Sequence, residues 1–225
     1  MLRSAKQSVW GIGDGPTLLD RHGVLHGMLK KICAGKFSVE APLIDMPTGK
    51  FGMWIFLISE IMFFTGLIGS YIVLRLGSAG WPRPGTMLNA PLLGFNTLVL
   101  LSSSLTMALG LAAIQHGKQA ALRRYLLLTA LLGSTFLCIK GYDYVHLWRH
   151  GFTISSSLFG SCYYLLTGFH GLHVLSGVIL VLYLTVAASR GAFSATRHVR
   201  VESSGLYWHF IDIVWVILFA ILCLV

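Results

Sequence analysis

The sequence carries little charge. Only 11% of the 225 residues are Asp, Glu, Lys or Arg, whereas a soluble domain of this size has about 25%. Hydrophobic residues make up 55% of the chain, which excludes an ordinary water-soluble globule. We therefore expect an all-α integral membrane protein, because a chain of this length suits a bundle of a few apolar helices.

Cysteine is scarce and scattered. The four cysteines are Cys33, Cys138, Cys162 and Cys223, and the sequence contains no CxxC pair. This pattern argues against a zinc site and a disulfide scaffold, and against a binuclear copper site with clustered cysteine ligands. The sequence also has no internal repeat and no inverted symmetry of the kind found in transporters.

Acidic residues are few, with eight Asp and Glu against seventeen Lys and Arg. In a soluble protein this excess would suggest nucleic acid binding. Here thirteen of the basic residues lie in segments 1–50, 115–124 and 189–202, and only four lie on the other side of the expected spans. The positive-inside rule then places the N-terminus in the cytoplasm and the C-terminus outside. We expect a lipid bilayer around the chain and no nucleic acid partner.

Five long apolar stretches predict a bundle of five transmembrane helices in residues 51–225. Their expected bounds are 51–75, 90–114, 124–147, 158–188 and 203–225. Each has the roughly 20 residues that cross the bilayer core. Segment 1–50 lacks such a run, so we expect a cytoplasmic arm, either an interfacial amphipathic helix or an irregular segment.

One carboxyl group, Glu60, falls inside the first expected span. It lies roughly 14 Å deep at about 1.5 Å per residue, where an unpartnered ionised carboxylate costs at least about 3 kcal/mol. We therefore expect Glu60 to be neutral or bonded to a donor. The best partners by depth are His173 and then His170 of the fourth span. Such a tie could fix helix register or handle protons, and both roles remain open.

Other polar residues lie in the later spans. His209 and Asp212 of the fifth span complete a candidate buried network with Glu60 and the fourth-span histidines. The facing histidines raise the question of a bis-histidine haem, but Gly, Trp and Tyr crowd both segments. We therefore expect no metal or cofactor on this chain.

A second set of polar residues lies near the outer end of the third span, and its members are three residues apart. Lys140, Asp143 and His146 form this outer-end row. The simplest interpretation is an intrahelical pair whose lysine extends toward the membrane surface.

Four segments closely resemble subunit III of haem–copper terminal oxidases, in that family's order and spacing. They are FGMWIFLISEIMFF (51–64), KGYDYVH (140–146), YYLLTGFHGLHVLSG (163–177) and ESSGLYWHFIDIVW (202–215). The resemblance covers Phe51 to the C-terminus, and segment 1–50 matches no motif. It implies a non-catalytic subunit, without redox centres, of a complex that reduces O2 to water and pumps protons. In that family the subunit stabilises subunit I and supports proton uptake.

The resemblance also implies particular partners and a location. We expect direct contact with subunit I, further contacts with subunit II and other subunits, and haem and copper on those partners. Glu60 aligns with the family's buried carbodiimide-reactive carboxylate. Bound phospholipid is a family property, although the cleft that holds it in seven-helix members uses two helices not predicted here. The five-helix form favours a bacterial inner membrane over a mitochondrial one.

Small residues recur at a spacing of four on the first two spans. Thr65 and Gly69, with Gly66 and Ser70, do so on the first span; Ser102, Thr106 and Gly110 do so on the second. Such stripes let helices approach closely. We expect these two spans to supply the main contact with subunit I.

Three alternatives remain open at this point. The chain could be an accessory subunit of a quinol oxidase or of a nitric oxide reductase, or a stand-alone proton-coupled transporter that uses Glu60 and the histidines. Glu rather than Asp at position 60 favours the cytochrome c type of oxidase. A transporter would need a substrate cavity and usually broken helices or repeats.

Overall fold

Five long helices run through the part of the chain that the computed structural model describes, residues 48–78, 80–81 and 89–224. They are α2 (Thr48–Gly77), α4 (Ala90–Gln115), α5 (Gln119–Arg149), α6 (Leu158–Ser189) and α7 (Val199–Phe219), which a π-helical turn, η1 (Ala220–Leu224), continues. All five are long and apolar enough to cross a membrane. This confirms the predicted five-helix membrane fold. The expectations for segment 1–47 lie outside the described residues, and α2 begins in the last three residues of the expected arm.

Local sequence signals set the helix ends. Asn89 and Ser157 cap α4 and α6 by accepting hydrogen bonds from backbone N–H groups of the first turn, at 3.2 and 3.0 Å. The α4 and α5 helices are followed by Gly117 and Gly151, whose φ angles of 73° and 78° are left-handed values that glycine adopts without strain. The short connections that follow make successive helices antiparallel neighbours.

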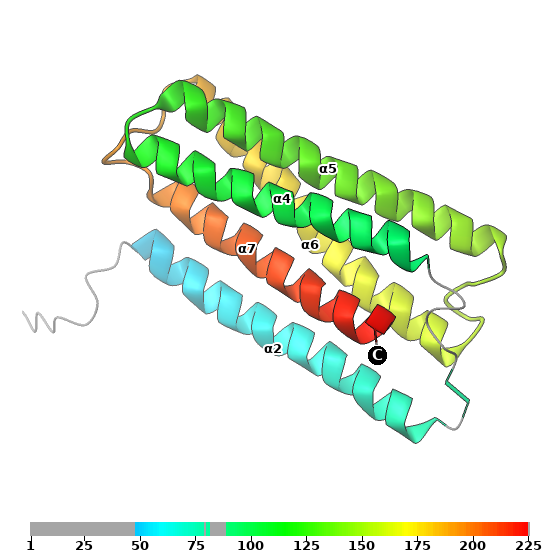
Figure 1. Cartoon of the computed structure of the whole chain (residues 1–225). Helices are drawn as coiled ribbons and strands as arrows, with labels where there is room; N and C mark the ends of the chain where they lie inside the picture. Colours follow the sequence, from blue (N-terminus) through cyan, green and yellow to red (C-terminus); the bar gives the residue numbers. More distant parts are fainter. Residues whose placement is uncertain (1–47, 79, 82–88, 225) are drawn as a thin grey trace, which may run out of the picture. The chain divides into compact units, whose positions relative to one another are not determined.

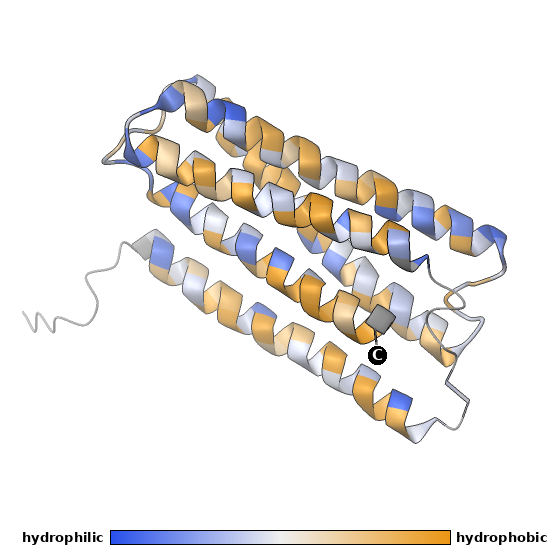
Figure 2. Ribbon diagram, in the orientation of Figure 1, coloured by the Kyte–Doolittle hydropathy of each residue, from blue (hydrophilic) through white to orange (hydrophobic). Residues whose placement is uncertain are grey.

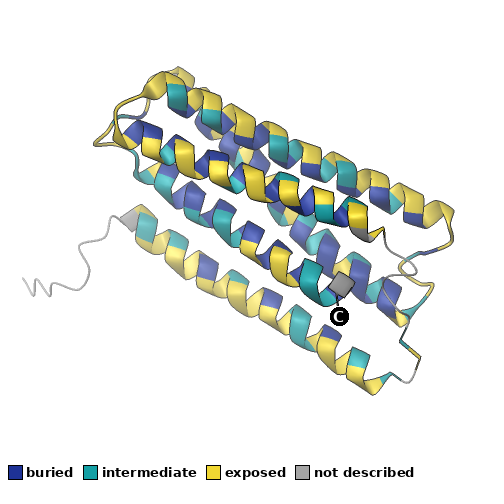
Figure 3. Cartoon of the chain, in the orientation of Figure 1, coloured by how far each residue is buried: buried dark blue, intermediate teal, exposed yellow. Residues whose placement is uncertain are grey.

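The helices differ greatly in how far they are enclosed. The described residues belong to one of two units in the chain, Met46–Val225. Within it α4 and α6 each pack against both α5 and α7, while α2 contacts α7 and, less extensively, α6 (Figure 1). Half of the apolar stretch of α7 is buried, 50% compared with 11% for α2. Figure 3 shows α2 exposed along most of its length, and Figure 2 shows apolar residues along the helices. Most of the α2 surface is therefore available to lipid or to another protein.

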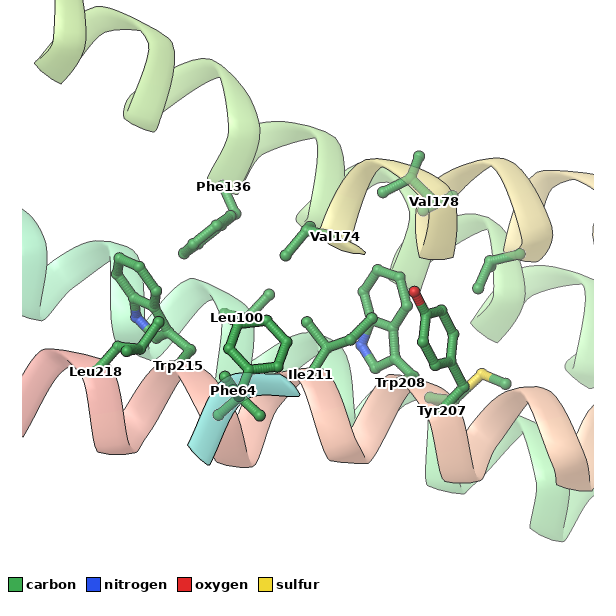
Figure 4. Close-up of a cluster of buried hydrophobic side chains, with 14 of the residues drawn as sticks. Phe64, Leu100, Phe136, Val174, Val178, Tyr207, Trp208, Ile211, Trp215 and Leu218 are labelled. Atoms are coloured by element: carbon green, nitrogen blue, oxygen red, sulfur yellow. The ribbon is translucent and has the colours of Figure 1, made fainter. Parts of the chain in front are cut away.

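Trp208 of α7 fills the centre of the helix packing (Figure 4). Its side chain is 1% exposed and lies against Gly133 of α5 and Gly177 of α6. A side-chain carbon at Gly133 would come within 2.6 Å of the indole ring, so glycine is needed there. The indole N–H donates to Ser103 Oγ of α4 at 3.0 Å, which satisfies its buried polar group. One side chain thus joins four helices.

The small-residue stripes of the first two spans have different surroundings. On α4, Thr106 Oγ1 lies 2.8 Å from Thr129 Oγ1 of α5. Gly110 also packs against α5, because a side-chain carbon at this position would lie 3.3 Å from Tyr125 Cβ. The part of the α4 stripe formed by these two residues therefore packs helices within the chain, which corrects its assignment to a contact with another subunit. On α2, a side-chain carbon at Gly66 or Gly69 would meet no other described atom within 4 Å. The glycines of the α2 stripe face outward.

Candidate functional site

Glu60 and His173 form a polar pair between the middle of α2 and the middle of α6. Glu60 Oε2 lies 2.9 Å from His173 Nε2, and each side chain is 18% exposed. Aromatic rings surround the imidazole, with Phe64 at 5.1 Å and Phe63 at 6.3 Å between ring centroids. The structure thus contains the pairing that span depth predicted, with His173 rather than His170 as the partner.

The hydrogen bonds of His173 determine how many protons the pair holds. His173 Nδ1 lies 2.7 Å from the Phe169 carbonyl oxygen, and a carbonyl can only accept, so Nδ1 must carry a hydrogen. Nε2 then either accepts from a neutral Glu60 carboxyl or, as an imidazolium N–H, donates to a carboxylate. Both forms are neutral overall and place one proton between Nε2 and Oε2. Losing that proton would set a carboxylate against a nitrogen lone pair within the membrane span, which is costly.

A tyrosine of α7 extends this tie to a third helix. Tyr207 OH donates to the backbone oxygen of His173 at 3.3 Å and lies 2.7 Å from Ser176 Oγ. Its ring packs on Phe56 of α2, with 5.7 Å between ring centroids. The position of His173 is therefore set by α2, α6 and α7 together.

His170 is buried elsewhere in the core and does not join the Glu60 pair. Its side chain is 1% exposed and its Nε2 lies 3.3 Å from the Ile211 carbonyl oxygen. The ring packs on Trp215 and Phe136, with 4.9 and 5.8 Å between ring centroids. Trp215 in turn donates to Thr97 Oγ1 at 2.9 Å. His170 therefore helps to fix the packing of α5, α6 and α7.

His209 and Asp212 lie at the junction of α7 and α4. His209 Nδ1 is 2.5 Å from Ser104 Oγ. Asp212 is 3% exposed, and neither carboxyl oxygen has a hydrogen-bond partner among the described residues. These three residues line a hollow of about 340 Å³, together with apolar residues such as Leu101 and Ile213. The five residues expected to form one network therefore occupy three separate places.

His173 and His209, the pair that raised the question of a bis-histidine haem, are each bonded within the chain. Such a site needs two imidazole nitrogens directed at one iron from facing helices. Both ring nitrogens of His173 are already engaged, and His209 is bonded to Ser104 at the junction with α4. No chemical step on this chain is therefore assigned to a haem.

Lys140 and Asp143, near the C-terminal end of α5, form a buried triangle with Tyr163 of α6. Lys140 Nζ donates to Asp143 Oδ2 at 3.0 Å and to Tyr163 OH at 2.6 Å, and Tyr163 OH donates to Asp143 Oδ2 at 2.8 Å. Both charged side chains are only 5% exposed. The rings of Tyr163, Tyr144 and Trp215 lie 4.8, 5.4 and 5.5 Å from the ammonium nitrogen, close enough for cation–π attraction.

This triangle corrects the sequence-based interpretation in two ways. The intrahelical pair of Lys140 and Asp143 is present, but Lys140 is buried and does not extend toward the membrane surface. His146 lies outside the triangle, is exposed and stacks on His150. Sequence reasoning missed Tyr163. The available signal was depth. Tyr163 lies in the first turns of the fourth span, which runs antiparallel to the third, and this places it level with Lys140.

Most of the chain matches one protein family. The family model described as cytochrome c oxidase subunit III matches residues 36–224, so the match begins within the arm for which no motif was found. The cytochrome c oxidase subunit 3 of Synechocystis sp. is 43% identical over 176 residues, covering 77% of this chain and 74% of that protein. The probable subunit 3 of Nocardia farcinica is 42% identical over 75% of this chain and 84% of its own length. The subunit 3 of Thermostichus vulcanus is 38% identical over 76% of this chain and 84% of its own length.

Proposed function

Because the chain belongs to the cytochrome c oxidase subunit III family, we propose that it serves its haem–copper oxidase as a non-catalytic subunit that stabilises subunit I and supports proton uptake. In this role the chain carries no redox centre, and haem and copper reside on partner subunits. The complex takes electrons from cytochrome c, reduces O2 to water and pumps protons.

The Glu60–His173 pair carries the proposal for proton uptake. The pair holds one proton that can reside on either Nε2 or Oε2 without changing the net charge. Each side chain is 18% exposed, so the pair is largely buried but still accessible from the surface of the chain. Movement of the proton within the pair changes no net charge, whereas its release leaves an unbalanced carboxylate inside the span and is costly. The pair therefore suits a proton buffer better than an obligatory pumping residue.

The surface of α2 supports the proposed contact with subunit I. Its outward glycines, Gly66 and Gly69, permit close approach of another helix. Large apolar side chains near them are exposed, for example Met62, whose exposed fraction is 72%. The bacterial relatives support a bacterial inner membrane. The same apolar surface also suits a bound phospholipid.

Two substitutions at Glu60 test the proton role. Glu60→Gln keeps a donor for His173 Nε2 but cannot titrate, so the complex should assemble and turn over nearly normally. We expect the loss to appear as faster inactivation during turnover and slower proton uptake at high pH. Glu60→Ala leaves His173 Nε2 without its partner, at about 1–3 kcal/mol, and should weaken subunit retention. Oxygen consumption, proton uptake and subunit content of the purified complex are the measurements.

The two variants separate structural and proton roles because only one of them removes the hydrogen bond. If Glu60→Gln abolished O2 reduction in a fully assembled complex, the carboxylate would be obligatory and the buffering role would be wrong. Identical inactivation and proton uptake in wild type and Glu60→Gln would leave Glu60 with a structural role alone.

A further inference from the structure

Two exposed histidines lie at the end of α5 that is far from the connections after α4 and α6: His146 is in the last turn, and His150 follows the last residue of the helix. They are four residues apart, so they lie on the same face of the helix. We propose that this pair binds a divalent transition-metal ion such as Zn²⁺. The site is separate from the Glu60–His173 pair and does not depend on the proposed proton role.

The two imidazole rings are already close together. Their ring centroids are 4.3 Å apart and their planes are tilted by 33°. Two Zn–N bonds of about 2.0–2.1 Å require nitrogens no more than about 4.2 Å apart. Both side chains are exposed, so the rings can rotate to direct two nitrogens at one ion. Two histidines at this helical spacing also supply the zinc ligands of the HExxH motif.

The backbone orients one of the rings for coordination. His150 Nδ1 lies 2.8 Å from the His146 carbonyl oxygen, so Nδ1 carries the hydrogen of the neutral ring and Nε2 presents its lone pair. A metal-bound histidine almost always donates its other ring N–H in this manner, to a carbonyl, carboxylate or water. The hydrogen bond also lowers the number of ring orientations that binding must select.

Space for an ion and its water ligands adjoins the pair. Both histidines line a hollow of about 500 Å³ with Gly151, Ser156 and Ser157 of the connection to α6. The described residues contain no group of three or more His, Cys, Asp or Glu side chains placed to hold a metal, so water completes the coordination. The carbonyl end of the α5 dipole favours a cation, and the charge of Arg149 in the same turn opposes it. Imidazole ligands suit Zn²⁺, Cu²⁺ and Ni²⁺ better than Mg²⁺ or Ca²⁺.

The test measures Zn²⁺ binding by equilibrium dialysis of the purified oxidase complex. Wild type should bind one more Zn²⁺ per complex than a variant carrying both His146→Ala and His150→Ala. Each single alanine variant should weaken that binding by about 10–100-fold or more, since removing even a supporting group costs that much. Mg²⁺ should not compete, and Ni²⁺ should. Equal Zn²⁺ binding by wild type and both single variants would overturn the proposal.

Two controls separate a chelating pair from histidine in general. His116→Ala removes an exposed histidine from the opposite end of the helices and should leave Zn²⁺ binding unchanged. Trp148→His combined with His150→Gln keeps the number of histidines but places the two on opposite sides of the helix, so it should lose the ion. Retention by this spacing variant would contradict the site. The amount of this chain in the purified complex, compared with subunit I, checks that every variant is assembled.

Discussion

Glu60 and Lys140 show two ways in which a polar side chain is accommodated inside a membrane span. Glu60 meets a histidine, and the pair can hold its proton in a form with no net charge on either partner. Lys140 meets a carboxylate and a phenol within a ring of aromatic side chains, and its charge is balanced by Asp143. The first arrangement suits proton exchange, whereas the second suits a fixed structural contact.

We predict that Lys140→Met strongly destabilises the chain, because it leaves the Asp143 carboxylate buried without its cation. Breaking a buried ion pair by removing one partner costs about 3–5 kcal/mol. Adding Asp143→Asn should recover most of this loss, since the amide oxygen still accepts from Tyr163 OH. The measurement is the temperature at which half of the chain is lost from the purified complex.

A matched control for this pair is Lys50→Met, which breaks the exposed contact with Glu202. That ion pair is 2.6 Å long but each side chain is 27% exposed, so its loss should cost only about 0–1 kcal/mol. If Lys140→Met were as mild as Lys50→Met, the triangle would contribute little to stability and this prediction would be wrong.

Helix α2 is attached to the rest of the described structure at three levels along its length. The polar contacts are Lys50–Glu202 at 2.6 Å, Glu60–His173 at 2.9 Å and Tyr71 OH–Ile221 O at 3.5 Å. Between them its buried residues are few, and its apolar stretch is only 11% buried. Polar contacts therefore set its register, while most of its apolar surface faces away from α6 and α7.

We predict that Gly66→Leu with Gly69→Leu releases the chain from subunit I without unfolding it. A Cβ at either position would meet no atom of another described helix within 4 Å, so the added side chains are directed at an outside contact. Gly133→Leu is the matched control, because there the new carbon would come within 2.6 Å of Trp208. Such overpacking typically costs about 1–3 kcal/mol.

Two measurements distinguish these outcomes. Membrane levels of the chain should fall for Gly133→Leu and stay normal for the α2 variant, whereas co-purification with subunit I should be lost for the α2 variant. Full retention of the α2 variant in the complex would move the contact to another surface.

In the described part of the chain, most basic residues gather at one end of the helices. The connections after α4 and α6 lie side by side, because Gln119 Nε2 donates to the Phe193 carbonyl oxygen at 3.1 Å. Six exposed Lys and Arg lie in or beside these connections, namely Lys118, Arg123, Arg124, Arg190, Arg197 and Arg200. The start of α2 is at the same end, since Lys50 reaches Glu202 near the start of α7.

We predict that this basic end faces the cytoplasm, with the C-terminus on the other side. A reporter enzyme that works only outside the cytoplasm should be active when fused after Val225, and one that works only inside should not. Fusions within the connection after α4 should show the reverse pattern and serve as the control. A C-terminal fusion active only in the cytoplasm would contradict the orientation.

Depth along each helix could be counted from the sequence alone. Five apolar stretches of sufficient length determined the number of spans, and their residue count placed Glu60 level with His173. The family motifs could also be read from the sequence, because each motif is a short continuous run of residues. Depth is readable because each residue of an α-helix advances by about 1.5 Å whatever it contacts.

Rotation of each helix about its own axis was decided only by the tertiary structure. The spans are apolar on all sides, so hydrophobic periodicity does not show which face is buried. Periodicity therefore did not show that Lys140 turns inward to Tyr163, where the sequence had predicted the opposite. Nor did it show that His170 packs on Trp215 or that Gly66 faces outward. These orientations depend on how large side chains such as Trp208 fit between neighbouring helices, and that fit involves residues far apart in the chain.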